Sequence, residues 1–168
     1  MLTGCLTRRA FFDRMTQAFE HARRRRTPLA CAVLDVDRFK SINDTFGHAV
    51  GDQVVQEVGR QLLASFRASD IVGRCGGDEF YIGMPECDMQ AAAVIAENMR
   101  QAIERECVAR LNISGLTLTI SAGLAALDER DQTLAHLLER ADKALYEAKT
   151  AGRNRVAHAA ASRSAVQA

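Results

Sequence analysis

The sequence predicts an α/β (α+β) fold in which helices flank a mixed, mostly antiparallel central sheet. Helical and strand-like segments follow one another in the order α-β-α-β-β-α-β-α-β. Two of the strand-like segments are joined by Gly76-Gly77, and such a pair is typical of a tight hairpin because glycine readily takes positive φ. A hairpin requires antiparallel pairing, which argues against a doubly wound parallel sheet.

One domain of this kind accounts for the chain. Its 168 residues are 48% hydrophobic and 26% charged, which is enough apolar surface for a real core. We expect the domain to span residues 1–158 and residues 159–168, which are rich in Ala and Ser, to form a flexible tail. The sequence is compatible with a small free-standing protein and with a module of a longer one.

The first half of the chain contains a helix, a strand and a second helix. Thr7 is suited to cap a helix that runs to about Arg26 and carries apolar residues at helical spacing. Four arginines, residues 23–26, end this helix, where cations suit the negative end of the helix dipole. A phosphate or nucleic-acid patch is the alternative interpretation. The apolar run Leu29–Val36 predicts a buried strand, and residues 50–66 show a helical apolar face.

The second half continues the alternation. The expected elements are strands over 71–75 and 80–84, a helix over 89–106, a strand over 116–127 with Gly123 as a candidate bulge, a long helix from Leu134, and an edge strand over 155–157.

Composition excludes several classes of protein. A net charge of +1 gives no general attraction for a polyanion, so we expect no nucleic-acid partner. No apolar run approaches the roughly 18 residues of a membrane span. The five cysteines lack CxxC spacing and do not cluster with the histidines, which argues against zinc; Cys31 is expected to be a buried hydrophobe. A reducing cytoplasm, or the cytoplasmic face of a membrane for a longer protein, is the expected location.

Two acidic turns carry the strongest functional signal. Asp35-Val36-Asp37 closes the buried strand, and Asp78-Glu79 follows the glycine pair of the hairpin. Carboxylates crowded at one sheet edge repel each other, and hard cations such as Mg²⁺ relieve this repulsion and then hold phosphates. The hypothesis is metal-dependent chemistry on a nucleotide. The alternative is an acidic hairpin tip in solvent.

Several motifs in the same order and spacing resemble one family. They are Leu2-Thr3-Gly4-Cys5-Leu6-Thr7-Arg8-Arg9, the stretch from Asp35 to Asp44 followed by Gly47-His48 and Gly51-Asp52, the signature Gly76-Gly77-Asp78-Glu79-Phe80, and the stretch from Ala141 to Lys149 followed by Gly152-Arg153-Asn154. Together they resemble the GGDEF domain of diguanylate cyclases, over about Leu2 to Ala157. The resemblance implies a palm-like sheet similar to that of nucleotidyl cyclases. It also implies condensation of two GTP molecules into cyclic di-GMP with loss of two pyrophosphates.

The same resemblance implies the cofactors and partners. Two Mg²⁺ ions per GTP, with Mn²⁺ as a substitute, would serve a site formed between the two subunits of a homodimer. Cyclic di-GMP would be both product and feedback inhibitor, and a sensor domain would regulate the enzyme if the chain belongs to a longer protein.

Carried over by motif, the metal ligands would be Asp35, the backbone carbonyl of Val36, and Asp78. Asp78 would also act as base for the attacking 3′-hydroxyl. Glu79 would support the metal or the transition state, because neighbouring strand residues face opposite ways and so do different work.

The phosphate ligands would be the backbone N–H groups of Arg38 and Phe39, at a helix start that suits anions, and the cations Lys40, Lys149 and Arg153. Ordinary surface charge is the alternative for all three cations, above all for Lys149 near a helix end.

Asn43 and Asp52 match the pair that reads guanine, because a carboxylate accepts from guanine N1–H and N2–H₂ and an amide can donate to O6 or N7. The alternative is a turn at Asn43-Asp44 and a helix cap at Asp52. His48 matches a nucleotide-contacting position, although a lone histidine is more often structural.

Arg67 and Asp70 match the family's product-inhibition motif, with helix-end charge and a cap as the alternative. A second arginine often completes that pocket from the third helix, where this chain has Asn98 with Arg100 nearby. The strength of inhibition is therefore open. Two other functional classes are alternatives: a catalytically silent GGDEF domain that binds GTP or cyclic di-GMP, and an interaction module without ligand.

Overall fold

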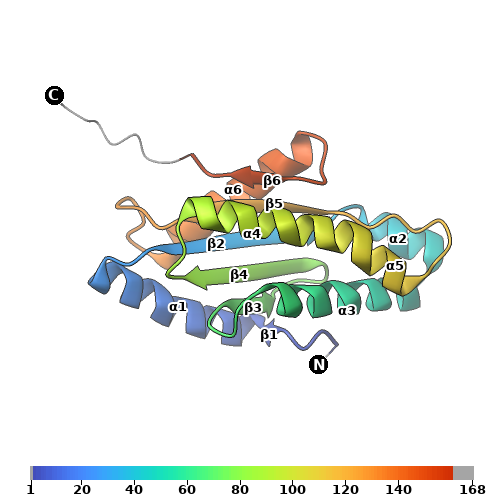
Figure 1. Ribbon diagram of the computed structural model, residues 1–168, viewed down its shortest axis with the longest axis horizontal. Helices are drawn as coiled ribbons and strands as arrows, with labels where there is room; N and C mark the ends of the chain where they lie inside the picture. The colour runs from blue at the N-terminus through green and yellow to red at the C-terminus, as the bar shows by residue number, and fades with distance from the viewer. Residues whose placement is uncertain (1, 161–168) are drawn as a thin grey trace.

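Six strands form one sheet in a computed structural model that describes residues 2–160. They are β1 (Leu6–Thr7), β2 (Leu29–Val36), β3 (Ile71–Arg74), β4 (Glu79–Pro85), β5 (Ile120–Ala126) and β6 (Val156–His158). Their order across the sheet is β1-β3-β4-β2-β5-β6. β2 lies at the centre and pairs antiparallel with both β4 and β5, while the outer pairs β1–β3 and β5–β6 are parallel (Figure 1). The predicted mixed, mostly antiparallel sheet is confirmed.

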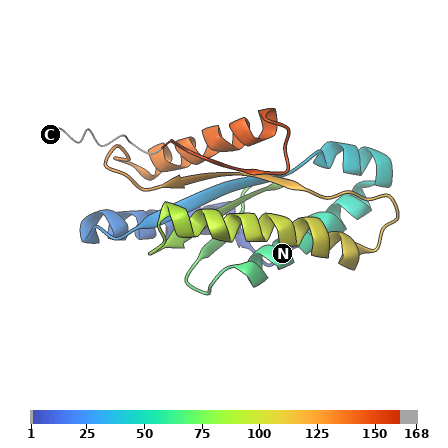
Figure 2. The same ribbon diagram turned by 45° about the horizontal axis from the view of Figure 1, so that its top comes forward.

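Helices cover both faces of the sheet. They are α1 (Arg8–Arg25), α2 (Phe39–Phe46), α3 (His48–Ser65), α4 (Met89–Ala102), the π-helical turn η1 (Ile103–Cys107), α5 (Val108–Leu111) and α6 (Leu134–Thr150). Figure 2 shows α6 on one side of the sheet and α4 on the other. The apolar side chains of α1 and α6 pack on one face and those of α3 and α4 on the other.

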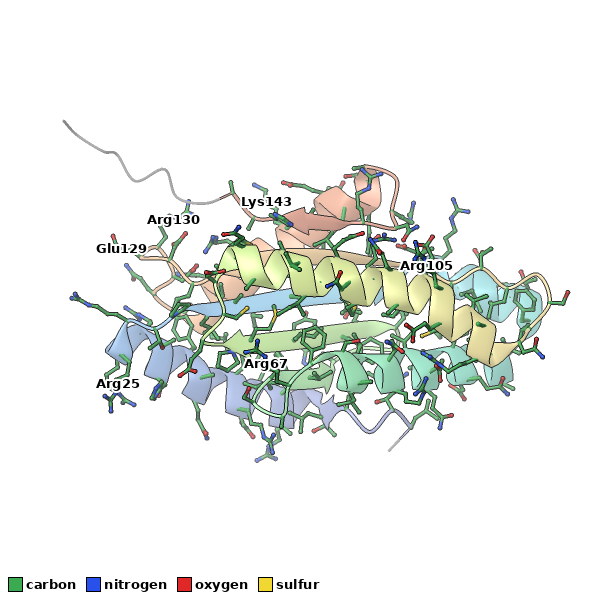
Figure 3. All side chains as sticks on the ribbon, in the orientation of Figure 1. Arg25, Arg67, Arg105, Glu129, Arg130 and Lys143 are labelled. Carbon is green, nitrogen blue, oxygen red and sulfur yellow. The ribbon has the colours of Figure 1, made fainter. Side chains whose placement is uncertain are left out.

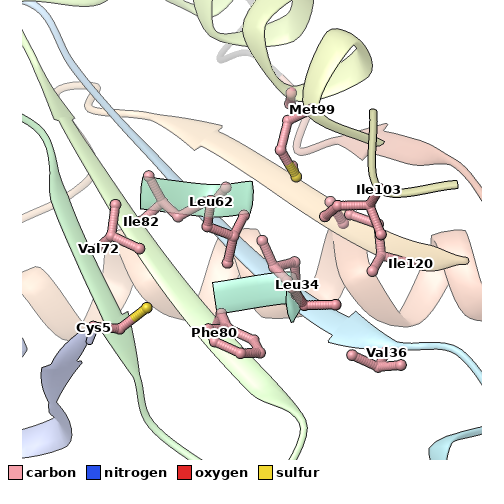
Figure 4. Close-up of a cluster of buried hydrophobic side chains, with 14 of the residues drawn as sticks. Cys5, Leu34, Val36, Leu62, Val72, Phe80, Ile82, Met99, Ile103 and Ile120 are labelled. Carbon is pink, nitrogen blue, oxygen red and sulfur yellow. The ribbon is translucent and has the colours of Figure 1, made fainter. Parts of the chain in front are cut away.

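The central strand explains why two cores form. Successive side chains of a strand point to opposite faces, so Leu34 joins the core under α3 and α4, whereas Cys31 and Val33 join the core under α1 and α6. A strand buried on both sides has to be largely apolar, and every residue of β2 except Asp35 is apolar, which is why the sequence predicted β2 with its observed bounds. Figure 4 shows the first of these cores around Leu34 and Phe80.

Sequence reasoning missed the short elements. β1 has two residues, and α2 was not among the expected elements, although the family resemblance implied a helix start at Arg38 and Phe39. The helix expected over 50–66 begins at His48, and the one expected over 89–106 continues through the π-helical turn to Leu111. The strand expected over 116–127 is only Ile120–Ala126. Phe39, Ile42 and Phe46 recur at helical spacing, but a helix of eight residues is too short to be distinguished from other short apolar segments by its period alone.

Gly123 is not a bulge, and that expectation is wrong. It pairs in unbroken register with Val33 on one side and Ala157 on the other. A Cβ at this position would lie 2.1 Å from both the carbonyl oxygen of Ala141 and the amide nitrogen of Leu145. Glycine is needed because the backbone of α6 approaches β5 closely at this point.

The arginine run at the end of α1 lies as predicted, whereas the C-terminal tail agrees only in part with its prediction. The arginines 23–26 are exposed, and Arg25 extends away from the end of α1 (Figure 3), as a solvated helix end requires. Ala159, in the tail expected to be flexible, still donates its N–H to the carbonyl of Leu124 at 2.7 Å. Residues 161–168 of that tail lie outside the described residues. Within residues 2–160, no helix has the length and hydropathy to cross a bilayer.

Candidate active site at the end of strand β2

The two acidic turns meet at one edge of the sheet. Asp35 and Glu79 are direct partners in the antiparallel β2–β4 ladder, so their side chains leave the same face of the sheet. The N–H of Val36 donates to the carbonyl of Asp78 at 3.2 Å, which places Asp78 beside this pair. At the hairpin tip, the Arg74 guanidinium donates to the Gly77 carbonyl at 2.6 Å. The structure therefore brings the two acidic turns together at this edge of the sheet.

The neighbouring carboxylates affect the pKa of Asp35. Burial raises the pKa of its carboxyl group above the ordinary value, the ammonium group of Lys149 lowers it, and the charges of Asp78 and Glu79 raise it further. The Nζ of Lys149 lies 2.9 Å from Oδ2 of Asp35, and the Asp35 side chain is 13% exposed. Lys149 at the end of α6 is therefore no ordinary surface charge, because it supplies the cation that this carboxylate cluster needs.

The carboxylates of Asp35 and Asp78 are ligands that suit a hard cation such as Mg²⁺. Within residues 2–160, no group of three or more His, Cys, Asp or Glu side chains is arranged to hold a metal ion. Mg²⁺, however, is usually bound through one or two carboxylates together with water and phosphate oxygens. Asp35 and Asp78 could supply those carboxylates. The Val36 side chain is fully buried in the core, so only its backbone could contribute.

Asp37 has a different position from its neighbour Asp35. Its carboxylate accepts hydrogen bonds from the hydroxyls of Thr119 at 2.8 Å and Ser121 at 2.7 Å, and from the N–H of Asn154 at 3.0 Å. These bonds fasten the end of β2 to β5 and to the turn before β6. Sequence reasoning missed this role, and the alternating hydroxyls of Thr117, Thr119 and Ser121 were the available signal.

The chain turns sharply after β2 and enters α2. Arg38 has a left-handed backbone with φ 54° and ψ 32°, and it precedes the first helical residue, Phe39. The first amides of a helix have no intrahelical partner and carry partial positive charge, so this helix start is suited to anions. Arg38 and Lys40 are exposed, and Phe39 is half-buried.

Asn43 and Asp52 lie on two helices that pack together. Asn43 belongs to α2, and Asp52 lies in the second turn of α3, which begins at His48. The alternative of a turn and a helix cap is therefore wrong. A Cβ on Gly51 would lie 1.9 Å from Oδ1 of Asn43, so the Asn43 amide rests on α3 immediately before the exposed Asp52. The exposed His48 lies one turn earlier.

Arg153, in the turn between α6 and β6, lies near the start of α2. It is exposed and lines a cavity of about 480 Å³ together with Arg38 and Gly152. Its backbone is left-handed, with φ 64°. The turn that carries Arg153 thus borders the start of α2.

Comparison with known proteins identifies the family. The family model described as diguanylate cyclase, GGDEF domain, matches residues 1–155. The chain belongs to the GGDEF domain family. The diguanylate cyclase DosC of Escherichia coli K12 is 38% identical over 156 residues, which cover 93% of this chain and 34% of DosC. The GGDEF domain thus spans about a third of that relative.

Solved structures agree with this assignment. The GGDEF domain of DgcB from Caulobacter crescentus, solved in complex with c-di-GMP, superposes with a TM-score of 0.87 at 33% identity and covers 95% of this chain and 94% of that one. The active GGEEF domain of a diguanylate cyclase from Vibrio cholerae gives a TM-score of 0.85 at 33% identity, covering 94% and 99% of the two chains.

The Arg67-Asp70 motif of this GGDEF domain lies away from the carboxylates. The motif occupies the loop before β3. The first residue of β3, Ile71, pairs with Gly83 near the end of β4, whereas Glu79 is the first residue of β4. Oδ2 of Asp70 accepts from the N–H of Arg67 at 2.8 Å and shapes the turn. Both residues line a cavity of about 360 Å³, which Arg14 of α1 also lines (Figure 3 labels Arg67).

The expected third-helix partner of this motif is placed elsewhere. Asn98 lines a separate hollow with Glu97 and His158, between α4 and β6. The Arg100 guanidinium is bound by Glu97 at 2.7 Å and Glu104 at 2.8 Å. In the described part of the chain, neither Asn98 nor Arg100 lines the Arg67 cavity.

Proposed function

We propose that this GGDEF domain condenses two GTP molecules into cyclic di-GMP and two pyrophosphates. The observation that carries this proposal is the meeting of Asp35, Asp78 and Glu79 beside the start of α2. In each of two successive steps, a 3′-oxygen forms a bond to the α-phosphorus of the other nucleotide, the bond to pyrophosphate breaks, and the hydroxyl proton passes to a base. Asp78 is the proposed base.

The proposed cofactor is Mg²⁺, two ions per GTP, with Mn²⁺ as a substitute. Asp35, Asp78 and the backbone carbonyl of Val36 would hold it. When bound, the ions would lower the pKa of the 3′-hydroxyl and neutralise charge on the leaving pyrophosphate. Glu79, the cross-strand partner of Asp35, adds negative charge that favours cations at this edge.

The proposed triphosphate site uses the start of α2 and three cations. The N–H groups of Arg38 and Phe39 would bind phosphate oxygens, since the partial charge of a helix start favours anions. Lys40 and Arg153 would pair with the same phosphates. Lys149, which lies beside Asp35, would be the third cation to pair with a phosphate.

Guanine is the base that the pair on α2 and α3 would select. The Asp52 carboxylate would accept from N1–H and N2–H₂, the Asn43 amide would donate to O6 or N7, and His48 would contact the nucleotide. Adenine offers no such donors, so a site built for them should reject ATP strongly.

Gly51→Ala is expected to raise KM for GTP about tenfold and to weaken the preference for GTP over ATP. The new Cβ would displace the Asn43 amide from its place before Asp52. Only a side chain has to move, and alanine is about 1 kcal/mol more favourable than glycine inside a helix, so thermal stability should not fall. Steady-state kinetics and thermal melts test this. A variant with unchanged KM and base preference would remove Asn43 from the guanine site.

A site shared by two subunits makes activity depend on dimerisation. We expect specific activity to rise with protein concentration and to level off once dimers saturate. Initial rates measured across the concentration range in which sedimentation detects the monomer–dimer transition test this. Specific activity that stays constant across the transition would contradict a shared site.

The Arg67-Asp70 cavity is proposed as a separate inhibitory site for cyclic di-GMP. A guanidinium can pair with phosphate and stack on guanine, and both Arg67 and Arg14 line this cavity. Added product should therefore inhibit the enzyme without competing directly for the carboxylates.

Incubation of the domain with GTP and Mg²⁺, followed by mass detection, tests the proposed activity. The expected products are cyclic di-GMP and pyrophosphate, with two pyrophosphates for each cyclic di-GMP. A domain that binds GTP or cyclic di-GMP and forms no product would instead be the silent receptor considered above.

A further inference from the structure

The turn between α6 and β6 has an unusual backbone. Three consecutive residues have positive φ: Gly152 at 117°, Arg153 at 64° and Asn154 at 46°. Glycine and asparagine tolerate this region, but a long side chain such as that of Arg153 rarely occupies it. A turn of this shape persists only where its surroundings hold it. Four hydrogen bonds, two from the backbone and two from the Asn154 side chain, do so here.

The first contacts are made by the backbone of the turn. The N–H of Arg153 donates to the carbonyl of Ala148 at 3.0 Å, which ties it to the end of α6. The N–H of Asn154 donates to Oδ2 of Asp37 at 3.0 Å. Because Asp37 also closes the end of β2, the turn and the loop that leads into Arg38 share one carboxylate.

The other two contacts are made by the side chain of Asn154. Its Oδ1 accepts from the Arg100 guanidinium at 2.5 Å, and its Nδ2 donates to Oε1 of Glu104 at 3.0 Å. Arg100 is itself held by Glu104 and Glu97, and its side chain is only 12% exposed. The Asn154 amide is thus fixed at both its oxygen and its nitrogen by residues of α4 and η1.

We propose that Asn154, held by Arg100 and Glu104, is a positioning residue for the triphosphate site. It orients Arg153 directly and steadies the β2–α2 loop through Asp37. This inference rests on the proposed function, since it gives Arg153 and the start of α2 a phosphate to bind. An ordinary surface network would have no effect on nucleotide affinity.

Asn154→Gly removes the amide and keeps a residue that accepts positive φ, so the turn loses its brace without gaining strain. We expect the dissociation constant for a non-hydrolysable GTP analogue with Mg²⁺ to rise about tenfold, and KM for GTP to rise equally with kcat within about threefold of wild type. Hydrogen exchange of the 152–154 amides should accelerate. Asn112→Gly is the matched control, because Asn112 also has a left-handed backbone, with φ 49°, and ends α5.

A pair of substitutions tests the contact itself. Asn154→Asp keeps the residue's size and its tolerance of positive φ but faces Glu104 with a second carboxylate, so affinity should fall. In Glu104→Gln/Asn154→Asp the amide and carboxylate have exchanged places, the hydrogen bond is possible again, and net charge equals that of wild type. This double variant should recover affinity to within about twofold. Glu104→Gln alone keeps an oxygen that can accept from Asn154 but loses the ion pair with Arg100, so its affinity should fall less than that of Asn154→Asp.

The possible outcomes distinguish a failure of the positioning role of Asn154 from a failure of the proposed activity. Faster exchange in Asn154→Gly with unchanged analogue affinity and KM would overturn the positioning role, as would a double variant no better than Asn154→Asp. Wild-type protein that binds the analogue but makes no product would remove the proposed activity and leave the affinity comparison decisive. Wild-type protein that binds no guanine nucleotide would overturn both.

Discussion

Asp78→Asn is expected to lower kcat for cyclic di-GMP formation by about a thousandfold or more while the domain stays folded. The change removes one negative charge and the proposed proton acceptor but retains the size of the side chain. The backbone carbonyl of Asp78, which accepts from Val36, is unaffected, so the sheet should remain intact.

Initial rates with saturating GTP and Mg²⁺, together with thermal melts, measure this effect. Asp13→Asn is the matched control, because Asp13 lies exposed on α1 and makes no contact with the acidic cluster. It should leave both rate and melting temperature unchanged. Activity of Asp78→Asn close to wild type would remove Asp78 from the chemistry.

Asp35→Asn should abolish activity and yet raise the melting temperature near pH 7. Burial and the charges of Asp78 and Glu79 hold the pKa of Asp35 above its ordinary value despite Lys149. The ionised carboxylate is therefore less favourable in the folded than in the unfolded chain, and a neutral amide removes that penalty. Activity should fall because a proposed ligand to Mg²⁺ is lost.

The sign of the pH dependence follows from the raised pKa. The folded chain binds the Asp35 proton more readily than the unfolded chain, so this group adds stability to the wild type as pH falls through the folded-state pKa. The advantage of the Asn variant should therefore be full above that pKa and disappear below the unfolded value of about 3.9. Melts of both proteins from neutral to acidic pH, without divalent ions, measure it. An Asn variant that is less stable than wild type at pH 7 would contradict the electrostatic argument.

The sequence predicted the elements whose signals are local. β2 is apolar except for Asp35 because both its faces are buried. Gly76 and Gly77 do lie in the turn of the β3–β4 hairpin, although neither has the positive φ on which that prediction rested. α2 shows helical apolar spacing in Phe39, Ile42 and Phe46, but its eight residues fall short of the roughly 10–12 that distinguish a helix from other short apolar segments. Gly123 was misread because its neighbour is the backbone of α6, which is distant in sequence.

In the candidate site, too, the sequence predicted some features and not others. The family motif pointed to Asp35 and Asp78, and the register of β2 with β4 brings their turns together. The ion pair of Asp35 with Lys149 and the three hydrogen bonds to Asp37 could not be predicted from spacing. These contacts join the ends of β2, β5 and α6, and only the folded sheet places those ends side by side.

A crystal structure of the domain with a non-hydrolysable GTP analogue and Mn²⁺ tests most directly whether acidic side chains from two turns hold the ions that bind the nucleotide. Anomalous scattering should place Mn²⁺ in direct contact with carboxylate oxygens of Asp35 and Asp78, with the triphosphate at the start of α2 and guanine against Asn43 and Asp52. Nucleotide bound elsewhere, or Mn²⁺ without contact to either carboxylate, would contradict it.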